Sequence, residues 1–498
     1  MIRKKLIGVL LVSSLIFLVT LRYSTQPTVQ GLNHNYESCQ SRYESGNYRK
    51  ESIHKPWPYL ISRLSEYEAL HKRCGPHTEA YKRKVRKLES GHFTDDHFSD
   101  CKYLVRIPLD GLGNRMLSLV SAFLYALLTN RVLLVHDKRI RMSDLFCEPF
   151  PETTWLLPRK FPIWKRLDTL NQNSPESYGK LLDFSGNFSS LAFLYLHIAG
   201  GYNDNDQRFF CDHDQIAFQN VSWLIMKSNF YFIPSLFMIP SFEQELDKLF
   251  PVKDTVFQFL ARYLFLPSNP VWDLITKFYQ THLANSDEKV GIQIRLFDRE
   301  YVASLFKTRW EYNAIPDTIL SCALENKMLP EISTNKSSEG DHHKSIAVIV
   351  TSLTSDHFEK IKKVYSKQST VDGSLVEVFQ PSSVRRQKTG NKWHNMKAWA
   401  DMYLLSLSDK LITSPGSTFG YVAQGLGGLT PWSLHMPDNE TVRKPPCTRA
   451  MSMEPCFHVP PSKGCDNRSG IDTGSIVPHV RHCEDFSWGL KLVDPSHF

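Results

Sequence analysis

The chain has 498 residues, of which 42% are hydrophobic and 22% charged, so it is long enough for two or three domains with a large core. Its 59 basic and 51 acidic residues leave a net charge of +8. This mild excess gives no support to a nucleic-acid partner, and it is compatible with an anionic small molecule.

The first residues predict a membrane anchor. The basic triplet at 3–5 precedes Leu6–Leu21, sixteen residues without a charge, and Arg22 follows them. A helix of that length spans roughly 24 Å, which suits the thinner membranes of the early secretory pathway. A cleaved signal peptide is the alternative, but the residues after the run are too bulky for a typical cleavage site. We therefore expect a cytoplasmic tail (1–5), an uncleaved anchor (6–21), a polar stem (22–38) and a lumenal remainder.

The cysteines and sequons agree with a lumenal protein. All ten cysteines follow the expected anchor and none forms a Cys-x-x-Cys pair, which favours disulfides over a zinc site. Their spacing does not reveal which cysteines pair. Five sequons are candidate glycosylation sites, at Asn187, Asn220, Asn335, Asn439 and Asn467.

Residues 59–88 are expected to be helical, with a basic run at 82–87. Such a run is most often a solvated helix face; contact with a membrane or an acidic polysaccharide is the alternative. The apolar run at 103–107 predicts a strand. In the segment after it, Met116, Val120, Phe123 and Leu127 recur at helical spacing, which indicates a buried helix beside a parallel sheet. A second short strand is expected at 132–136.

The loop between that first strand and the helix has the composition of an anion site. It carries Gly111, Gly113, Asn114 and Arg115. It is neither a P-loop nor a dinucleotide fingerprint, because the required lysine and third glycine are absent. The start of a helix still offers unsatisfied N–H groups to an anion, and glycines let the backbone approach a ligand. A glycine turn that serves packing is the alternative.

A second block of strands and helices begins near residue 289. Strands are expected at 290–294, 346–351, 410–413 and 432–435, with helices at 395–407 and after Ser414. Two such blocks predict an α/β protein with two Rossmann-like halves facing across a cleft, at 39–285 and 286–498. Residues 137–285 contain many aromatic residues and prolines and have no clear pattern.

Two polar groups follow strands of this second block. Arg295 ends a short strand, where a guanidinium can hold a phosphate through two hydrogen bonds; pairing with a nearby acidic residue is the alternative. Ser414, Ser417 and Thr418 follow another strand, and their hydroxyl and N–H groups can hold a diphosphate or serve only to cap the next helix. Together with the first loop, they suggest a nucleotide diphosphate in the cleft between the halves.

Two Asp-x-Asp triplets raise a metal hypothesis. Asp204 with Asp206, or Asp212 with Asp214, could hold Mg²⁺ or Mn²⁺ on a sugar nucleotide, and Asp204 or Asp206 is also a candidate general base. Because such triplets are common in polar loops, a structural role beside Cys211 is favoured. His479 and His482 are likewise expected to be surface or structural residues beside Cys483.

Several long motifs resemble one family. VGIQIRLFD, LSDKLITSPGSTFGYVAQGLGGLTPW, CTRAMSMEPCFH and PHVRHCEDFSWGLKLV are similar to the plant galactoside α-1,2-fucosyltransferases, which act on xyloglucan and arabinogalactan. The resemblance extends from about Cys39 to Val493. It implies a GT-B fold, a GDP-L-fucose donor, no metal or other cofactor, and a single-pass type II protein of the Golgi membrane. It also implies that fucose is transferred to O2 of a terminal galactose with inversion.

The resemblance further implies roles for single residues. Arg295 and Asp298 match catalytic positions, and Gly111–Arg115 and Ser414–Phe419 match the loops that line the donor site. Two positions depart from the wider pattern. Leu296 replaces a second arginine, which the plant family itself tolerates, and Gly416 stands where a bulky aromatic is common.

The partners expected from this resemblance are GDP-fucose, the Golgi membrane and a galactosylated polysaccharide or proteoglycan. The acceptor glycan and a homodimer both stay open. Two alternatives to this enzyme are a metal-dependent GT-A transferase that uses Asp204 and Asp206, and a catalytically inactive glycan-binding scaffold with the same fold.

Overall fold

A computed structural model of the protein describes residues 38–90, 101–138, 141–182, 191–296, 314–333, 344–384, 388–437, 441–462, 465 and 472–497. The expected tail, anchor and stem up to residue 37 lie outside this part of the chain, as does Asp298. Four of the five sequons also lie outside it: Asn187, Asn335, Asn439 and Asn467. Among the helices in the described ranges, none has both the length and the apolar character needed to cross a membrane.

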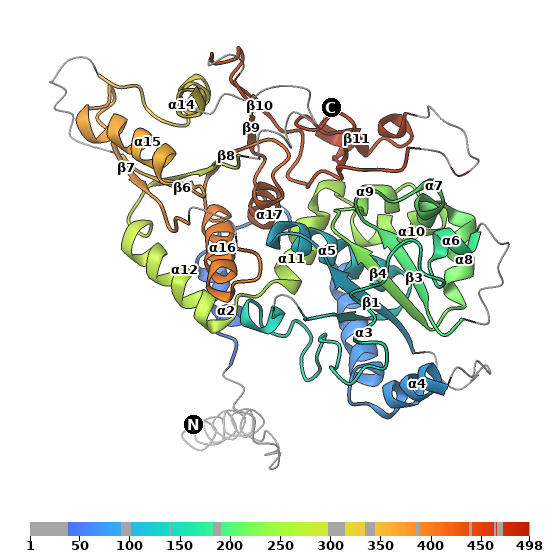
Figure 1. The fold of residues 1–498 in the computed structure, drawn as a ribbon. Helices are drawn as coiled ribbons and strands as arrows, with labels where there is room; N and C mark the ends of the chain where they lie inside the picture. Colours follow the sequence, from blue (N-terminus) through green and yellow to red (C-terminus); the bar gives the residue numbers. More distant parts are fainter. Residues whose placement is uncertain are drawn as a thin grey trace, which may run out of the picture. The chain divides into compact units, whose positions relative to one another are not determined.

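The expected strand at 103–107 belongs to a four-stranded sheet in the order β2-β1-β4-β3 (Figure 1). The strands are β1 (Lys102–Pro108), β2 (Arg131–Val135), β3 (Leu194–Ile198) and β4 (Trp223–Ser228). Neighbouring strands are all parallel. The residues of β2 are all buried, which suits the near-continuous Val and Leu run of a strand that is covered on both faces.

Helix α5 (Leu112–Leu128) joins β1 to β2 and lies in the centre of the core. The four residues predicted to share its buried face are 0–1% exposed, namely Met116, Val120, Phe123 and Leu127. The other described α-helices of this part are α2 (Gln40–Glu44), α3 (Pro58–Cys74), α4 (Glu79–Ser90), α6 (Tyr178–Leu182), α7 (Asp204–Gln207), α8 (Asp212–Gln219), α9 (Ile233–Leu236), α10 (Pro240–Leu249), α11 (Val256–Leu264) and α12 (Asn269–His282).

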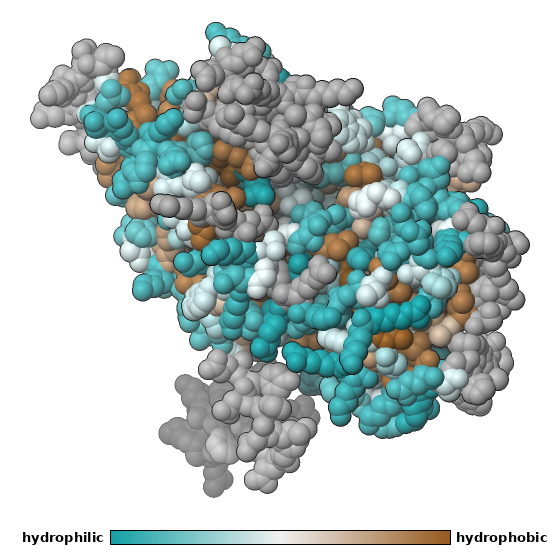
Figure 2. Space-filling view, in the orientation of Figure 1, coloured by the Kyte–Doolittle hydropathy of each residue, from teal (hydrophilic) through white to brown (hydrophobic). Residues whose placement is uncertain are grey.

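The prediction of a single helix at 59–88 is wrong, because this region forms two helices, α3 and α4. Gly75 ends α3 in an extended conformation, and it precedes Pro76. A proline disfavours helical geometry in the residue before it, so the helix cannot continue through this pair. The basic run lies on α4, where Lys82, Arg83 and Arg86 are exposed. Figure 2 shows hydrophilic residues over this part of the surface, in agreement with a solvated face.

The second sheet has the order β10-β9-β8-β5-β6-β7, and all its pairs are parallel except β9 with β10. Its strands are β5 (Glu288–Gln293), β6 (Ser345–Thr351), β7 (Leu375–Phe379), β8 (Lys410–Thr413), β9 (Trp432–Leu434) and β10 (Cys447–Arg449). Its helices are α14 (Ile315–Glu325), α15 (Asp356–Lys367), α16 (Lys392–Leu405) and α17 (Thr418–Gly427). Helix α17 ends at Gly428, whose φ of 73° is left-handed, as expected for a glycine stop. The predicted α/β class is therefore confirmed, with a parallel first sheet and a second sheet that is parallel apart from the β9–β10 pair.

The chain after β10, here called the C-terminal segment (from residue 450), packs against the part of the chain that carries the first sheet. Strands β11 (Val480–His482) and β12 (Leu490–Leu492) form an antiparallel pair, and β12 contacts α9. The ring of Phe457 lies 5.7 Å from the ring of Phe230. Residues 39–498 form one compact unit. The boundary between halves at 285 and 286 therefore stays a prediction, although each sheet lies within its expected half.

All ten cysteines form disulfides, as the sequence indicated. The pairs are Cys39–Cys147, Cys74–Cys101, Cys211–Cys465, Cys322–Cys447 and Cys456–Cys483. The Cys211–Cys465 pair joins the C-terminal segment to the start of α8 across 254 residues of sequence.

Candidate active site

A cavity of about 760 Å³ lies where strands of both sheets end. The segments that line it follow β1, β4, β5, β6 and β8, and further residues come from α16 and the C-terminal segment. Ligands of α/β proteins bind at the carboxyl ends of strands, and this volume is typical of a small-molecule site. Seven of the predicted donor-site residues line the cavity: Gly111, Gly113, Asn114, Arg295, Ser417, Thr418 and Phe419.

Two helices, one from each sheet, begin side by side at this cavity. A Cβ atom on Gly113 would lie 2.9 Å from the backbone carbonyl carbon of Thr418, so the absence of a side chain allows α5 and α17 to approach. The Thr418 hydroxyl donates to Asn114 Oδ1 at 3.0 Å. Gly113 therefore serves packing as well as lining the cavity. First-turn residues of both helices line the cavity, and the free N–H groups at a helix start are suited to an anion.

Arg295 follows β5 at the same end of the second sheet. Its backbone N–H donates to Ser414 Oγ at 2.9 Å, and this bond ties the residue to the end of β8. Burial lowers the pKa of the guanidinium, which nevertheless stays protonated, as arginine does in proteins. Ser414 is buried and does not line the cavity. It holds the backbone of Arg295 and is not placed to contact a ligand.

Arg115 was also predicted to contact the donor, and the structure does not support this. Its side chain is 4% exposed and is absent from the lining of the cavity. Its Nε–H donates to the Asp110 carbonyl at 2.7 Å. The arginine therefore stabilises the loop from behind, since the helical position after Asn114 turns it toward the core.

The Asp-x-Asp triplets are structural. Asp206 forms a capping box with Asn203 at the start of α7, and neither Asp204 nor Asp206 lines the cavity. Asp214 pairs with Arg208 through two hydrogen bonds, at 3.0 and 3.1 Å. The candidate base at Asp204 or Asp206 is thus wrongly placed.

Within the described part of the chain, neither triplet belongs to a group of three side chains that could hold a metal ion. One such group is found among the described residues, formed by Cys456, Cys483 and Asp485. The two cysteines are joined in a disulfide, so their sulfurs are not available as thiolate ligands. The predicted structural role of the histidines is borne out for His482, which contacts Asp472 at 2.7 Å.

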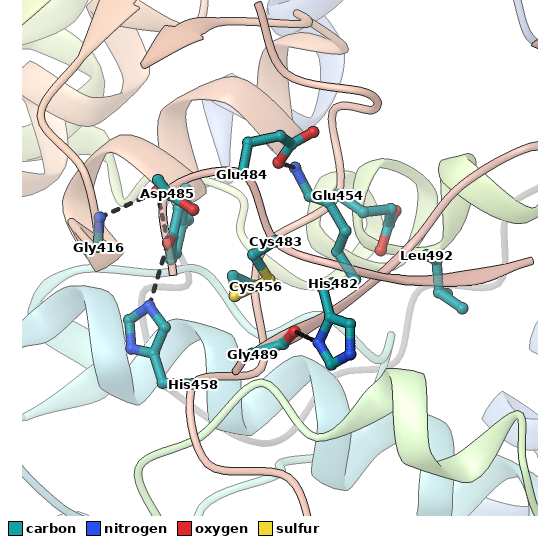
Figure 3. Close-up of a disulfide and its surroundings, with 12 residues drawn as sticks. Gly416, Glu454, Cys456, His458, His482, Cys483, Glu484, Asp485, Gly489 and Leu492 are labelled. Carbon is teal, nitrogen blue, oxygen red and sulfur yellow. Dashed lines mark hydrogen bonds and ion pairs between the residues drawn. A yellow bond between two sulfur atoms is a disulfide. The ribbon is translucent and has the colours of Figure 1, made fainter. Parts of the chain in front are cut away.

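The C-terminal segment contributes residues to the lining of the cavity that sequence reasoning missed. Figure 3 shows how Gly416, His458 and Asp485 lie near the Cys456–Cys483 disulfide. Asp485 accepts hydrogen bonds from Gly416 N–H at 2.9 Å and from the Tyr421 hydroxyl at 2.8 Å. His458 lies 3.1 Å from the same hydroxyl and stacks on Phe486, and both rings line the cavity. Burial lowers the pKa of His458 to about 4, so this imidazole is neutral at physiological pH. The motifs EPCFH and HCEDFSW carry these residues, but their spacing gave no signal of proximity.

A family model described as xyloglucan fucosyltransferase matches residues 30–466. The chain belongs to this family. It is 53% identical over 462 residues to a galactoside 2-alpha-L-fucosyltransferase of Pisum sativum. The aligned residues make up 92% of this chain and 80% of that protein. A galactoside 2-alpha-L-fucosyltransferase of Arabidopsis thaliana is 52% identical over 464 residues, which make up 92% of this chain and 81% of that protein.

A solved structure supports the same assignment. An arginine-to-lysine mutant of Arabidopsis thaliana FUT1 in complex with GDP superposes with a TM-score of 0.84. It is 50% identical and covers 93% of this chain and 98% of that chain. The resemblance inferred from the motifs is therefore confirmed.

The departure at Gly416 has a backbone explanation in this family member. Its φ is 64°, in the left-handed region that favours glycine, and its N–H bonds to Asp485. A Cβ atom there would meet Phe486 at an ordinary 3.7 Å, so space does not exclude a side chain. The conformation of the loop, rather than crowding, suits the glycine.

Glu454 gives a prediction for the pH dependence of stability. Its carboxyl is fully buried and accepts hydrogen bonds from the Tyr231 hydroxyl and, at 2.7 Å, from Phe257 N–H. Burial raises its pKa from about 4.5 to about 8, although both hydrogen bonds oppose the rise. Between these values the folded chain binds a proton that the unfolded chain has lost, so the free energy of unfolding falls as the pH rises.

The variant Glu454→Gln keeps the shape and removes this titration. We expect its melting temperature to decline less than that of wild type between pH 5 and 8, and to be higher by a few degrees, on the order of 2–4 °C, at pH 8. Parallel melting curves for the two proteins across this range would contradict the assignment.

Proposed function

We propose that the protein is an inverting galactoside α-1,2-fucosyltransferase. It moves L-fucose from GDP-fucose to O2 of terminal galactose on xyloglucan or arabinogalactan side chains. The observation that carries the proposal is the convergence of Arg295 with the starts of α5 and α17 on one cavity, in a chain of the xyloglucan fucosyltransferase family.

The reaction is a single displacement. The galactose O2 attacks C1 of fucose while GDP departs from the opposite face, so negative charge grows on the β-phosphate. The Arg295 guanidinium, the N–H groups at the start of α17 and the Ser417 hydroxyl stabilise this charge more in the transition state than in the ground state. The Thr418 hydroxyl donates to Asn114 and holds the start of α17 against α5. Gly111, Gly113 and Asn114 form the facing side of the donor site. No metal is needed in this scheme, because the cationic side chain and the helix starts supply the positive potential.

Asp401 on α16 is proposed to recognise the guanine base. It lines the cavity, is 7% exposed and accepts a hydrogen bond from the Ser382 hydroxyl. A carboxylate can accept from both N–H donors on one edge of guanine, and adenine lacks this pair. Burial raises the pKa of Asp401 to about 7, so donors on a bound base would favour the ionised form.

The variant Asp401→Asn is therefore expected to weaken GDP binding by about 10–100-fold, since it loses a hydrogen bond to a charged group. GDP affinity should also rise between pH 6 and 8 in wild type by more than in the variant. Calorimetry at both pH values measures these effects, with the affinity for ADP as the control. An unchanged GDP affinity would remove guanine recognition from Asp401.

The function itself is tested with the purified full chain, labelled GDP-fucose and a panel of xyloglucan and arabinogalactan acceptors with and without terminal galactose. Label should enter galactosylated acceptors, in an α-1,2 linkage, and the degalactosylated forms should stay unlabelled. Turnover that disappears in EDTA would favour the metal-dependent alternative. Failure to bind GDP in calorimetry would favour the non-catalytic scaffold.

We also propose the lumen of the Golgi as the site of action, with residues 6–21 as the anchor of a single-pass type II protein. Five disulfides suit an oxidising compartment, which supports this placement. The exposed Asn220 after α8 is a sterically open candidate for glycosylation.

A further inference from the structure

Among the described residues, two carboxylates line the cavity, and they come from different halves of the chain. Asp401 is buried beside Ser382 on α16, in the second half. Asp110 is exposed and lies in the loop between β1 and α5, in the first half. The two carboxylates therefore reach the cavity from different halves of the chain.

The backbone holds Asp110 in an uncommon conformation. Its φ of 59° is left-handed, which few residues other than glycine adopt, although aspartate and asparagine tolerate it. The Asp110 carbonyl accepts from Arg115 Nε at 2.7 Å, and its Oδ2 accepts from Asn229 Nδ2 at 2.5 Å. Backbone strain of this kind, held by surrounding contacts, clusters at functional sites.

A chain of hydrogen bonds connects this carboxylate to the proposed donor loop. Asn229 donates to Asp110, and its own carbonyl accepts from Asn114 Nδ2 at 3.3 Å. Asn114 Oδ1 in turn accepts from the Thr418 hydroxyl. The position of the carboxylate is thus set relative to the start of α17, where the diphosphate is proposed to bind.

Charge excludes one role and leaves another. An ionised carboxylate and a diphosphate repel each other, so Asp110 is not a ligand of the phosphates. In the proposed displacement, the neutral galactose approaches C1 of fucose from the face opposite the diphosphate. Asn229 donates to Oδ2, and no residue in the described part of the chain donates to Oδ1.

We propose that Asp110 is the general base of the transfer, and this inference rests on the proposed function. As the galactose O2 forms its bond to C1 of fucose, the O2–H proton passes to Asp110 Oδ1. The bond from C1 to the β-phosphate oxygen breaks, and its electron pair leaves with GDP. Asn229 orients the carboxylate by donating to Oδ2, and Arg115 holds the loop from behind.

The test compares Asp110→Asn, Asp110→Ala and the control Asp204→Asn in the full chain. Asparagine tolerates the same φ and can still accept from Asn229, so Asp110→Asn removes basicity and keeps the positioning contact. We expect it to lower kcat for transfer by about 10²-fold, the lower end of a typical general-base contribution, with GDP affinity unchanged. The control is expected to match wild type, because Asp204 does not line the cavity.

Rescue by azide distinguishes a general base from a residue that only supports the structure. It attacks C1 as an anion and needs no base, so Asp110→Ala should gain azide-dependent GDP release with fucosyl azide as product. Transfer by Asp110→Asn within threefold of wild type would overturn the proposal. So would loss of transfer without azide-dependent turnover, because Asp110 would then only position the loop. If wild type binds GDP but transfers no fucose, the proposed function fails instead.

Discussion

Replacing Arg295 with alanine is expected to lower the rate of fucose transfer by about 10²–10³-fold, the usual effect of removing one donor that stabilises transition-state charge. The backbone N–H of Arg295, which bonds to Ser414, is retained in the variant, so the ends of β5 and β8 should stay joined. The melting temperature should therefore remain near that of wild type. Initial rates with saturating GDP-fucose and acceptor measure the effect on kcat.

Two variants sharpen this prediction. Arg295→Lys keeps the positive charge and loses the planar fork that binds two phosphate oxygens, so its rate should lie between those of alanine and wild type. Arg83→Ala on the exposed face of α4 is the matched control and should have normal activity. If Arg295→Ala keeps more than about a tenth of wild-type turnover, this guanidinium is not the group that stabilises the departing diphosphate.

Replacing Gly113 with alanine is expected to disturb both stability and transfer. The new methyl group would lie 2.8 Å from the Thr418 hydroxyl oxygen and 2.9 Å from its backbone, so α5 and α17 must separate. Overpacking of this kind costs about 1–3 kcal/mol of unfolding free energy. A shift of the start of α17 by about 1 Å would also displace the diphosphate site, and such misplacement can cost about 10²-fold in rate.

Gly46→Ala is the control for this experiment. A Cβ atom there would have no neighbour within 4 Å, so the substitution tests the loss of a glycine without a clash. Thermal melting and kcat should both be unchanged in Gly46→Ala and lowered in Gly113→Ala. A Gly113→Ala enzyme with wild-type melting and turnover would show that the helix starts can separate without consequence.

Much of the architecture was predictable because it depends on neighbours in sequence. The apolar runs that became β1, β5 and β8 and the buried face of α5 follow from hydrophobic periodicity. The cap at Ser417 and the stop at Gly428 follow from local backbone chemistry. The break between α3 and α4 could have been predicted, because Gly75 and Pro76 stand between them.

The candidate site was predictable in part. Arg295 and the loops at 111–114 and 417–419 follow strands, and the ends of parallel strands meet at one edge of a sheet. Arg115 and Ser414 come from the same motifs, yet they support the loops from behind. Proximity in sequence to a ligand loop does not decide which way a side chain points.

The sequence by itself determined the secondary structure around the cavity and, through long specific motifs, the xyloglucan fucosyltransferase family. Only the tertiary structure decided which polar groups meet. The contact between Asn114 and Thr418 spans 304 residues, and that between Tyr231 and Glu454 spans 223. Local propensity carries no information about such pairs, because they form only when two sheets, and a C-terminal segment folded back beside the first, enclose the same cavity.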